Sequence, residues 1–579
     1  MQDDTTPSWF ETTWTGPKGL GLTSHENSLS WRAFAALILL CLCLYLPGIS
    51  ALPPTDRDES FFAQASKQMV ETHNYVDIRF LDATRYKKPI GIYWLQAASV
   101  KLFNPDHLNE IWAYRVPSLL GATLAVLMTA ALGALFFNNV IGFAAGVMMA
   151  CCLDLGIEAH LAKTDAALLG SVMVAQYALA RAYRLPQSGY WNAFAFWTAI
   201  GAGILLKGPI ILLTLGSTLL WLRVTEKNLS WFKRLKPIEG LFYAAMLVAP
   251  WFIAINLASH GRFTEASAGK DFLAKLWQGQ DRGFVPPGMH TLIFPAMFFP
   301  FSLFALLAIP DAWASRRIAS VRFLLGWIIP TWIVFELSST KLPHYVLPAY
   351  PAMALLTAKF FFDGYPLLTN SEKRWWPTLS VGLWLIIGMV LAAGFCVIPF
   401  ITNGKLYPPQ IIGSLALLLA QGLGMLLFLR GRKMQSVVLF ALGSIVFYGI
   451  AYAATVPNLN GVWLARDILA EARRDAPCPE LKIASSGFSE PSLAFLAGTS
   501  TKFTPNGTFA VSEMQHDPCR VGVINEPQLE GFLLGSSDFP TQPKPVGGEV
   551  DGLNLGHGSG IKLHFYVMPP SHEPTPQYP

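Results

Sequence analysis

The residues of this chain that could do chemistry are gathered in one polar segment, directly after the first apolar stretch. Asp58 and Glu59 come first, and Arg85 and Lys88 follow further along the same segment. A positioned carboxylate can take the proton of an attacking hydroxyl group, and fixed cations can stabilise the charge of a departing phosphate. Charges concentrated beside a bilayer usually mark a functional site. We therefore predict a group-transfer site in this segment.

The composition shows which elements must position this segment. Apolar residues make up 53% of the 579 residues and charged residues only 14%, which excludes a soluble protein of this length. Apolar windows of about the length that crosses a hydrocarbon core of ~30 Å recur along most of the chain. They cover residues 33–48, 117–136, 139–153, 166–180, 192–206, 209–222, 239–257, 291–309, 322–337, 345–361, 377–399, 409–429 and 436–455. The sequence therefore predicts a mainly α-helical, polytopic membrane domain over residues 33–455, with about thirteen transmembrane helices.

The short loops differ in charge between the two sides of this domain. With residues 1–32 in the cytoplasm and the first span kept as an anchor, most Lys and Arg residues of the short loops are cytoplasmic, as the positive-inside rule requires. The first loop (residues 49–112), the cluster 158–165, Lys207 and the segment 338–344 then share the opposite compartment with the carboxyl terminus. Residues far apart in the sequence can therefore build one site.

Two amphipathic helices are predicted within the first loop. Apolar residues recur at helical spacing in two runs, Phe61, Phe62, Ala65, Met69 and Val70, then Ile90, Tyr93, Trp94, Ala97, Ala98 and Leu102. Helices of this kind lie in the membrane interface. Asp58 and Glu59 fall at the start of the first helix, where a carboxylate also gains from the helix dipole. Simple capping is the alternative to a catalytic role for these two residues.

The order of the motifs resembles a known family. Asp58-Glu59-Ser60-Phe61-Phe62-Ala63-Gln64, followed by Arg85-Tyr86-Lys87-Lys88-Pro89-Ile90-Gly91-Ile92-Tyr93-Trp94, is similar to the first periplasmic loop of C-type glycosyltransferases that use polyprenyl-phosphate sugars. Further matches follow in family order: Lys163-Thr164-Asp165-Ala166, Lys207-Gly208-Pro209, Pro250-Trp251 and Lys341-Leu342-Pro343-His344-Tyr345-Val346-Leu347-Pro348. The likeness is to bacterial aminoarabinose (lipid A) transferases and to protein O-mannosyltransferase-like proteins.

The resemblance implies a reaction and its participants. A sugar leaves an undecaprenyl or other polyprenyl phosphate and joins an acceptor, with inversion, at the outer face of the bacterial inner membrane. The acceptor is lipid A, another envelope glycolipid, a polysaccharide or a protein; membrane lipids are further partners, and nucleic acid is not one. The implied catalytic residue is Asp58. The implied substrate- or phosphate-binding residues are Lys88, Arg85, Lys207, Lys341 and Tyr345, with Glu59, Asp165 and His344 in support.

Several of these residues also have purely structural interpretations. Asp165 can cap the helix that follows it, and Lys207 can belong to a turn between spans. Lys341 can extend its ammonium group to the interface without meeting substrate. His344 and Tyr345 can be packing residues of the same interface.

The chain departs from the aminoarabinose transferases at positions that bear on the sugar. Lys87 stands where that group tends to carry an acidic residue, and Phe61 stands where it has Arg. The segment from Phe272 to Trp277 lacks the external-loop His of that group. A carboxylate able to recognise an amino sugar is therefore missing at one expected place.

Rival functions use the same features. A lipid-linked sugar transporter or flippase would place charges at mid-span depth, whereas here the charges lie near the outer ends of the spans. A protein O-mannosyltransferase or an oligosaccharide ligase would differ from a glycolipid-modifying transferase in the mass of its product. Asp56-Arg57-Asp58 matches the Asp-x-Asp metal motif of nucleotide-sugar transferases, but those donors are cytoplasmic. Arg57 and the nearby lysines already supply positive charge. We predict no required metal or other cofactor, although two carboxylates could bind a divalent cation.

The chain changes character after residue 455. Residues 456–568 contain the predicted strands Leu481–Ala484, Arg520–Ile524 and Lys562–Met568 and the predicted helices Gly461–Arg474 and Glu490–Leu496. We expect a small periplasmic α/β domain followed by a disordered tail, residues 569–579. Cys478 and Cys519 both fall in this oxidising compartment, so we predict a disulfide between them.

Overall fold

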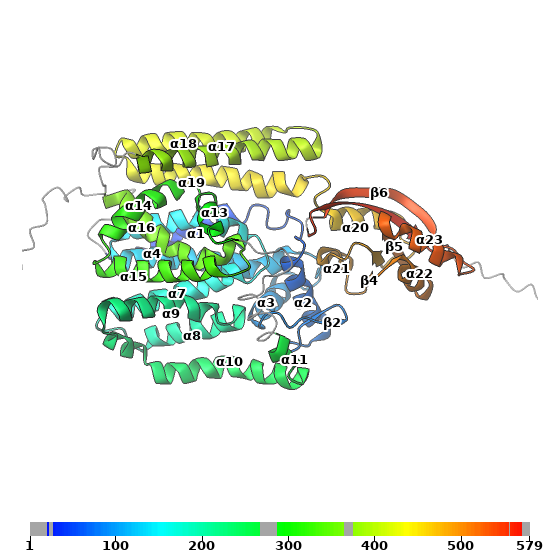
Figure 1. Cartoon of the computed structure of the whole chain (residues 1–579), viewed down its shortest axis with the longest axis horizontal. Helices are drawn as coiled ribbons and strands as arrows, with labels where there is room; N and C mark the ends of the chain where they lie inside the picture. Colours follow the sequence, from blue (N-terminus) through cyan, green and yellow to red (C-terminus); the bar gives the residue numbers. More distant parts are fainter. Residues whose placement is uncertain (1–19, 23–26, 267–285, 364–374, 555, 570–579) are drawn as a thin grey trace, which may run out of the picture.

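Long helices lying side by side make up most of the molecule (Figure 1). The structure is a computed structural model that describes residues 20–22, 27–266, 286–363, 375–554 and 556–569. A smaller domain lies at one end of the helices, with α2 and α3 between the two parts. Most of the predicted cytoplasmic segment 1–32, the segment from Phe272 to Trp277, and nearly all of the predicted tail lie outside the described residues.

Each predicted apolar window falls on a helix. In chain order these are α1 (Trp31–Tyr45), α4 (Trp112–Phe136), α5 (Asn139–Ala150), α7 (Asp165–Arg184), α8 (Tyr190–Lys207), α9 (Ile210–Glu226), α10 (Pro237–Ser259), α13 (Met289–Met297) with α14 (Ser302–Ala314), α15 (Ala319–Leu337), α16 (Tyr350–Asp363), α17 (Trp375–Asn403), α18 (Pro408–Leu429) and α19 (Lys433–Ile450). Among the described residues, 7 helices are long and apolar enough to cross a membrane, and up to 8 if the bent pair of α5 and α6 (Leu153–Ala159) is one span. The chain is a multi-pass membrane protein.

The helices differ in how far other protein segments cover them. In the apolar window that contains α16, 83% of the residues are buried, whereas in α10 and α17 only 17% are buried. Leu241 and Phe242 of α10, and Ile386 and Met389 of α17, are exposed. Apolar surface of this extent belongs against lipid rather than water. The outer helices therefore face the bilayer, and α16 lies inside the bundle.

Small residues let the inner helices approach closely. A Cβ atom added to Gly121 of α4 would lie 2.5 Å from the backbone of Ala166, near the start of α7. One added to Gly133 of α4 would lie 2.6 Å from the Cα atom of Gly142 in α5. Helices in lipid associate by such contacts, because small residues allow backbone to meet backbone. The start of α7, where Asp165 lies, is thereby fixed against α4.

The two helices predicted in the first loop are α2 (Asp58–Thr72) and α3 (Gly91–Phe103), and β1 (Arg79–Phe80) pairs with β2 (Ala83–Thr84) between them. The surroundings of α2 differ from the prediction of an interfacial helix with an open polar face. Gln64 and Lys67 are buried, and Gln64 Nε2 donates a hydrogen bond of 2.9 Å to Thr499 Oγ1. Helix α21 (Pro491–Ala497) of the C-terminal domain packs on α2. Periodicity could not reveal this cover, because it is supplied by a distant part of the chain.

The C-terminal domain is built around a mixed sheet in the strand order β4-β3-β5-β7-β6. Its strands are β3 (Lys482–Ser486), β4 (Lys502–Thr504), β5 (Arg520–Asn525), β6 (Lys544–Asn554) and β7 (Ser559–Val567); its helices are α20 (Leu464–Arg474), α21, α22 (Gly507–His516) and α23 (Leu529–Ser537). β4 and β5 pair with β3 in parallel, whereas β7 is antiparallel to β5 and to β6. Because side chains alternate along a strand, Ile483 faces the core under α20 and Ala484 faces the core under α22.

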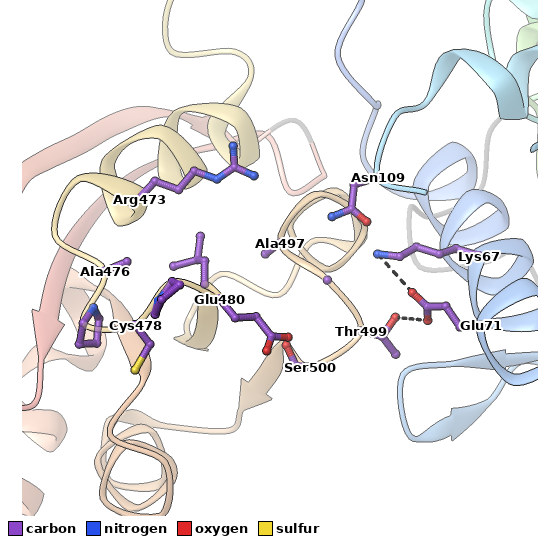
Figure 2. Close-up of a pocket in the computed structure, with 14 residues that line it drawn as sticks. Lys67, Glu71, Asn109, Arg473, Ala476, Cys478, Glu480, Ala497, Thr499 and Ser500 are labelled. Atoms are coloured by element: carbon purple, nitrogen blue, oxygen red, sulfur yellow. Dashed lines mark hydrogen bonds and ion pairs between the residues drawn. The ribbon is translucent and has the colours of Figure 1, made fainter. Parts of the chain in front are cut away.

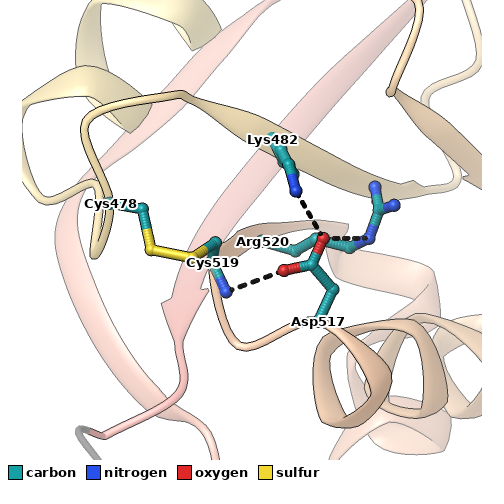
Figure 3. The surroundings of a disulfide bond; sticks show 5 residues. All are labelled: Cys478, Lys482, Asp517, Cys519 and Arg520. Carbon is teal, nitrogen blue, oxygen red and sulfur yellow. Dashed lines mark hydrogen bonds and ion pairs between the residues drawn. A yellow bond between two sulfur atoms is a disulfide. The ribbon is translucent and has the colours of Figure 1, made fainter.

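A disulfide joins Cys478 to Cys519 at the edge of this domain, with the two Cα atoms 5.3 Å apart (Figure 3). Asp517 orders the turn beside it, since its carboxylate accepts a hydrogen bond from the backbone N–H of Cys519 and pairs with Lys482 at 3.1 Å. The disulfide therefore ties the segment before β3 to the segment before β5.

Candidate functional site

A cavity of about 540 Å³ opens among the ends of several membrane helices. Five of the residues predicted from the sequence line it: Lys88, Asp165, Lys207, His344 and Tyr345. Lys88 precedes α3, Asp165 begins α7, Lys207 ends α8, and the last two belong to η4 (Pro343–Ala349). The tertiary structure thus brings four separate sequence motifs to one place.

The rest of the cavity wall is mainly apolar. Leu212 and Leu213 of α9 and Val334 and Phe335 of α15 line it. Binding sites of this size combine an apolar lining with a few placed polar groups that fix the ligand's orientation. Cations beside an apolar wall suit an amphiphile whose anionic head group is attached to a hydrocarbon chain.

Five charged or titratable side chains form a continuous row at this cavity. Lys163 Nζ lies 2.9 Å from Glu158 Oε1, and His344 Nδ1 lies 3.3 Å from the same oxygen. His344 Nε2 lies 3.7 Å from Asp165 Oδ1, and Asp165 in turn pairs with Lys207. All of these side chains are at most 14% exposed. Buried charges persist where they are paired, so the row holds both ammonium groups in fixed positions.

The same row of charges determines the pKa of Lys163, in the loop before α7. Burial by itself lowers the pKa of Lys163, but the carboxylates of Glu158 and Asp165 outweigh burial and hold the pKa above its ordinary value. Asp58 contributes to the same increase in pKa. Asp58 therefore lies within electrostatic reach of the row, although it is not part of the cavity lining.

Asp58 is presented by a turn that the C-terminal domain helps to hold. It is exposed and begins α2. The residue before it, Arg57, has φ = 66°, a region that few residues other than Gly, Asn and Asp adopt. The Arg57 guanidinium donates a hydrogen bond to the carbonyl oxygen of Gly556. A strained backbone persists only when its surroundings fix it, so this contact supports the position of Asp58.

Glu59 faces away from the cavity and anchors the same turn. Its Oε1 lies 2.8 Å from Arg115 Nε, and both side chains are fully buried. The Glu59 carboxylate also accepts hydrogen bonds from the backbone N–H groups of Thr55 and Ala162. Burial acts to raise the pKa of Glu59, but the Arg115 charge together with the hydrogen bonds from Arg115, Thr55 and Ala162 outweighs burial and lowers the pKa below its usual value. Glu59 is a positioning residue.

Two further predicted phosphate-binding residues lie outside the cavity lining. The Arg85 guanidinium is buried 3.8 Å above the ring of Phe61. Lys341 is also buried, and its ammonium group donates a hydrogen bond of 2.7 Å to the Ser338 carbonyl oxygen. The structure therefore gathers Lys88 and Lys207 at the cavity, whereas Arg85 and Lys341 serve neighbouring segments.

Known proteins share both the sequence pattern and the fold. Residues 87–253 match the family described as dolichyl-phosphate-mannose-protein mannosyltransferase. The undecaprenyl phosphate-α-4-amino-4-deoxy-L-arabinose arabinosyl transferase of Aeromonas salmonicida is 26% identical over 401 residues, which cover 66% of this chain and 69% of that protein. An uncharacterised protein of Aquifex aeolicus is 23% identical over 80% of this chain and 87% of its own length. The crystal structure of ArnT from Cupriavidus metallidurans bound to undecaprenyl phosphate superposes with a TM-score of 0.71 at 16% identity, over 92% of this chain and 97% of that one. These matches make the chain a glycosyltransferase that is similar to the C-type family.

Two buried charged residues of this glycosyltransferase, Arg115 and Glu158, were not among the site residues predicted from the sequence. Arg115 lies within an apolar helix, and an ionisable residue at such a place is itself a signal of function or of a buried partner. Glu158 belongs to the polar cluster recognised in the sequence, but its position between Lys163 and His344 depends on the packing of α6 against η4. The first residue could have been found from the sequence and the second could not.

Asp56, the first residue of the Asp-x-Asp triplet, contacts the C-terminal domain. Asp56 accepts a hydrogen bond from the Ser492 hydroxyl of α21, and burial raises the pKa of Asp56 to about 6. Within the described part of the chain, no group of three or more His, Cys, Asp or Glu side chains is arranged to hold a metal ion. That the enzyme requires no metal stays a prediction from the sequence.

Proposed function

We propose that this glycosyltransferase moves a sugar from a polyprenyl phosphate, such as undecaprenyl phosphate, to an envelope acceptor at the outer face of the bacterial inner membrane. The observation that carries the proposal is the cavity that combines Lys88 and Lys207 with an apolar wall. Its cations suit the phosphate and its apolar wall suits the prenyl chain. The relatives named as arabinosyl transferases support the same donor class.

The proposed reaction assigns a step to each group. An acceptor oxygen attacks the anomeric carbon, its proton passes to the Asp58 carboxylate, and the bond from that carbon to the phosphate oxygen breaks. The phosphate leaves with the electron pair and gains negative charge, which Lys88 and Lys207 stabilise more in the transition state than in the ground state. A single displacement inverts the anomeric centre. If the acceptor is itself a phosphate, Asp58 orients it and takes no proton.

The topology and the acceptor belong to the same proposal. The thirteen apolar windows cross the membrane as about thirteen helices, the site and residues 456–568 lie in the periplasm, and the acceptor is lipid A or another envelope glycolipid or polysaccharide. The match to a protein mannosyltransferase family supports a protein acceptor as the second candidate. Lys87 and Phe61, where the aminoarabinose transferases differ, argue that the sugar need not be aminoarabinose.

The test is sugar transfer by the purified protein from a panel of undecaprenyl-phosphate sugars to native envelope lipids, with product masses read by mass spectrometry. We expect Asp58→Asn and Lys88→Gln to lose at least a hundredfold in rate at equal folded amount. The matched controls are Asp106→Asn and Lys405→Gln, which remove the same charges from exposed positions outside the cavity lining. Translocation of the donor without transfer, unaffected by Asp58→Asn, would instead establish a transporter.

A further inference from the structure

A second cavity, of about 1020 Å³, lies outside the membrane helices, between α2 and the C-terminal domain (Figure 2). We call it the interdomain cavity. Lys67 and Glu71 of α2 and the nearby Asn109 form one wall; the end of α20 and the segments 476–481 and 497–500 form the other. It shares no lining residue with the 540 Å³ cavity. Its size and separate position require an explanation of their own.

The interdomain cavity is polar without an excess of either charge. Lys67 and Arg473 are its cations, and Glu71 and Glu480 are its carboxylates. Asn109 adds an amide, and Thr499 and Ser500 add hydroxyl groups; the amide and the hydroxyls can each donate and accept hydrogen bonds. Figure 2 shows Lys67 and Asn109 on one side, with Arg473, Glu480 and Ser500 on the other.

Several of these polar groups have bonding capacity left over. The Lys67 side chain is only 3% exposed, yet its contacts are long: 3.8 Å to Glu71 and 3.4 Å to the Phe495 carbonyl oxygen. An ammonium group has three donors, and burial lowers the pKa of Lys67. Arg473 and Glu480 make no ion pair or side-chain hydrogen bond within the described part of the chain. Arg473 and Glu480 are exposed, so both are accessible to a ligand that donates and accepts hydrogen bonds.

This lining selects among ligand classes. A prenyl chain is disfavoured because the wall offers Leu481 as its only large aliphatic side chain among the lining residues. A phosphate is disfavoured because Glu71 and Glu480 would repel it. Sugar hydroxyl groups both donate and accept, so they match a wall of fixed donors and acceptors at no net charge.

We propose that the interdomain cavity binds the glycan head group of the acceptor, a polyhydroxylated chain of more than one sugar. The inference rests on the proposed function, because it treats the glycan as the acceptor. Helix α2 links the two sites: Lys67 follows Asp58 by nine residues, which corresponds to about 13 Å along a helix. A head group held beside Lys67 can therefore extend toward Asp58 only if it is longer than a single sugar.

The matched variants are Arg473→Gln and Arg474→Gln in the full-length protein. Both residues are exposed in the last turn of α20 and lose the same charge, but only Arg473 lines the cavity. The probes are neutral oligosaccharides of two to four sugars, offered free in solution and, in a second arm, attached to lipid in nanodiscs. We expect Arg473→Gln and Glu480→Gln to weaken glycan binding at least tenfold and Arg474→Gln to leave it unchanged. Binding in both arms identifies the glycan itself as the ligand, and binding only in the lipid arm identifies a glycolipid head group.

Transfer kinetics separate this inference from the proposed function. Where transfer occurs, we expect Arg473→Gln to raise KM for the acceptor at least tenfold and to leave kcat and undecaprenyl phosphate binding unchanged. Glycan binding that depends on Arg473 in a protein that transfers no sugar would keep the glycan site and overturn the proposed function. Absence of glycan binding by the wild type, or equal binding by Arg473→Gln and Arg474→Gln, would overturn the glycan site whatever the transfer assay shows.

Discussion

Arg115 and Glu59 join the membrane helices to the turn that carries Asp58. The guanidinium of Arg115 binds the Glu59 carboxylate through Nε and Nη2, and it also donates hydrogen bonds to the carbonyl oxygens of Ile49, Leu52 and Pro53. The pair is fully buried, so none of these bonds is replaced by water when it is broken.

Removal of either Arg115 or Glu59 should destabilise the turn that carries Asp58. We expect Arg115→Met to lower the free energy of unfolding by about 3 to 5 kcal/mol, because it leaves the buried Glu59 carboxylate without its cation and removes the donor from three carbonyl groups. Glu59→Gln should cost less, since the carbonyl contacts of Arg115 remain. Thermal unfolding in detergent measures both. Arg474→Gln, which removes an exposed ion pair with Glu471, is the control and should change stability by less than about 1 kcal/mol; equal losses in all three variants would contradict the prediction.

Docking of the C-terminal domain should strengthen as the pH falls from 7 to 5. Burial raises the pKa of Asp56 from 3.8 to about 6 in the folded protein, so the folded state binds a proton more readily than the unfolded state. Stability from this group is therefore fully present below about pH 4 and is lost as the pH rises through about 6. Hydrogen exchange of α21 between pH 5 and 7.5 measures the effect.

Asp56→Asn is the matching variant for that titration. The amide oxygen can still accept the Ser492 hydrogen bond, and it carries no charge. We expect the variant to protect α21 at pH 7 as strongly as the wild type does at pH 5, with no pH dependence from this position. A wild-type profile that is flat across this range, or one that persists in the variant, would refute the assignment to Asp56.

The disulfide should stabilise the C-terminal domain and keep the interdomain cavity formed. Cys478 and Cys519 are 41 residues apart, and closing a loop of that length stabilises a domain by about 4 kcal/mol in the chain-entropy account. We expect Cys478→Ser to lower the unfolding temperature of the domain and to weaken glycan binding, because residues 476–481 line that cavity. Reduction with dithiothreitol should have no further effect on the variant. Unchanged melting after reduction of the wild type would argue against a structural role.

Lys207 and Leu213 should bind different parts of the donor. Lys207→Gln should weaken binding of undecaprenyl phosphate at least tenfold without changing the affinity for undecaprenol, which lacks the phosphate. Leu213→Gln should weaken binding of both, because it places a polar group on the apolar wall. Calorimetry in nanodiscs distinguishes the two patterns. Lys207→Arg retains the pairing with Asp165 and should recover most of the loss, whereas Lys405→Gln, an exposed change outside the cavity, should have no effect.

The sequence by itself was enough to determine the membrane class, the places of the helices and the reaction class. Apolar windows predict helices well because a backbone in lipid must satisfy its own hydrogen bonds. The run of motifs from Asp58 to Pro348 was enough to indicate the family. Strands β3, β5 and β7 were found because their apolar residues are local signals, whereas β6, with mostly exposed residues, gave none.

The tertiary structure decided which of those residues meet. It placed Lys88 and Lys207 at one cavity and left Arg85 and Lys341 out of its wall, although all four are cations of the same motifs. It also buried the polar side of α2 under α21 and created the interdomain cavity between α2 and the C-terminal domain. Contacts of this kind depend on how distant helices pack against each other, and neither periodicity nor motif order carries that information.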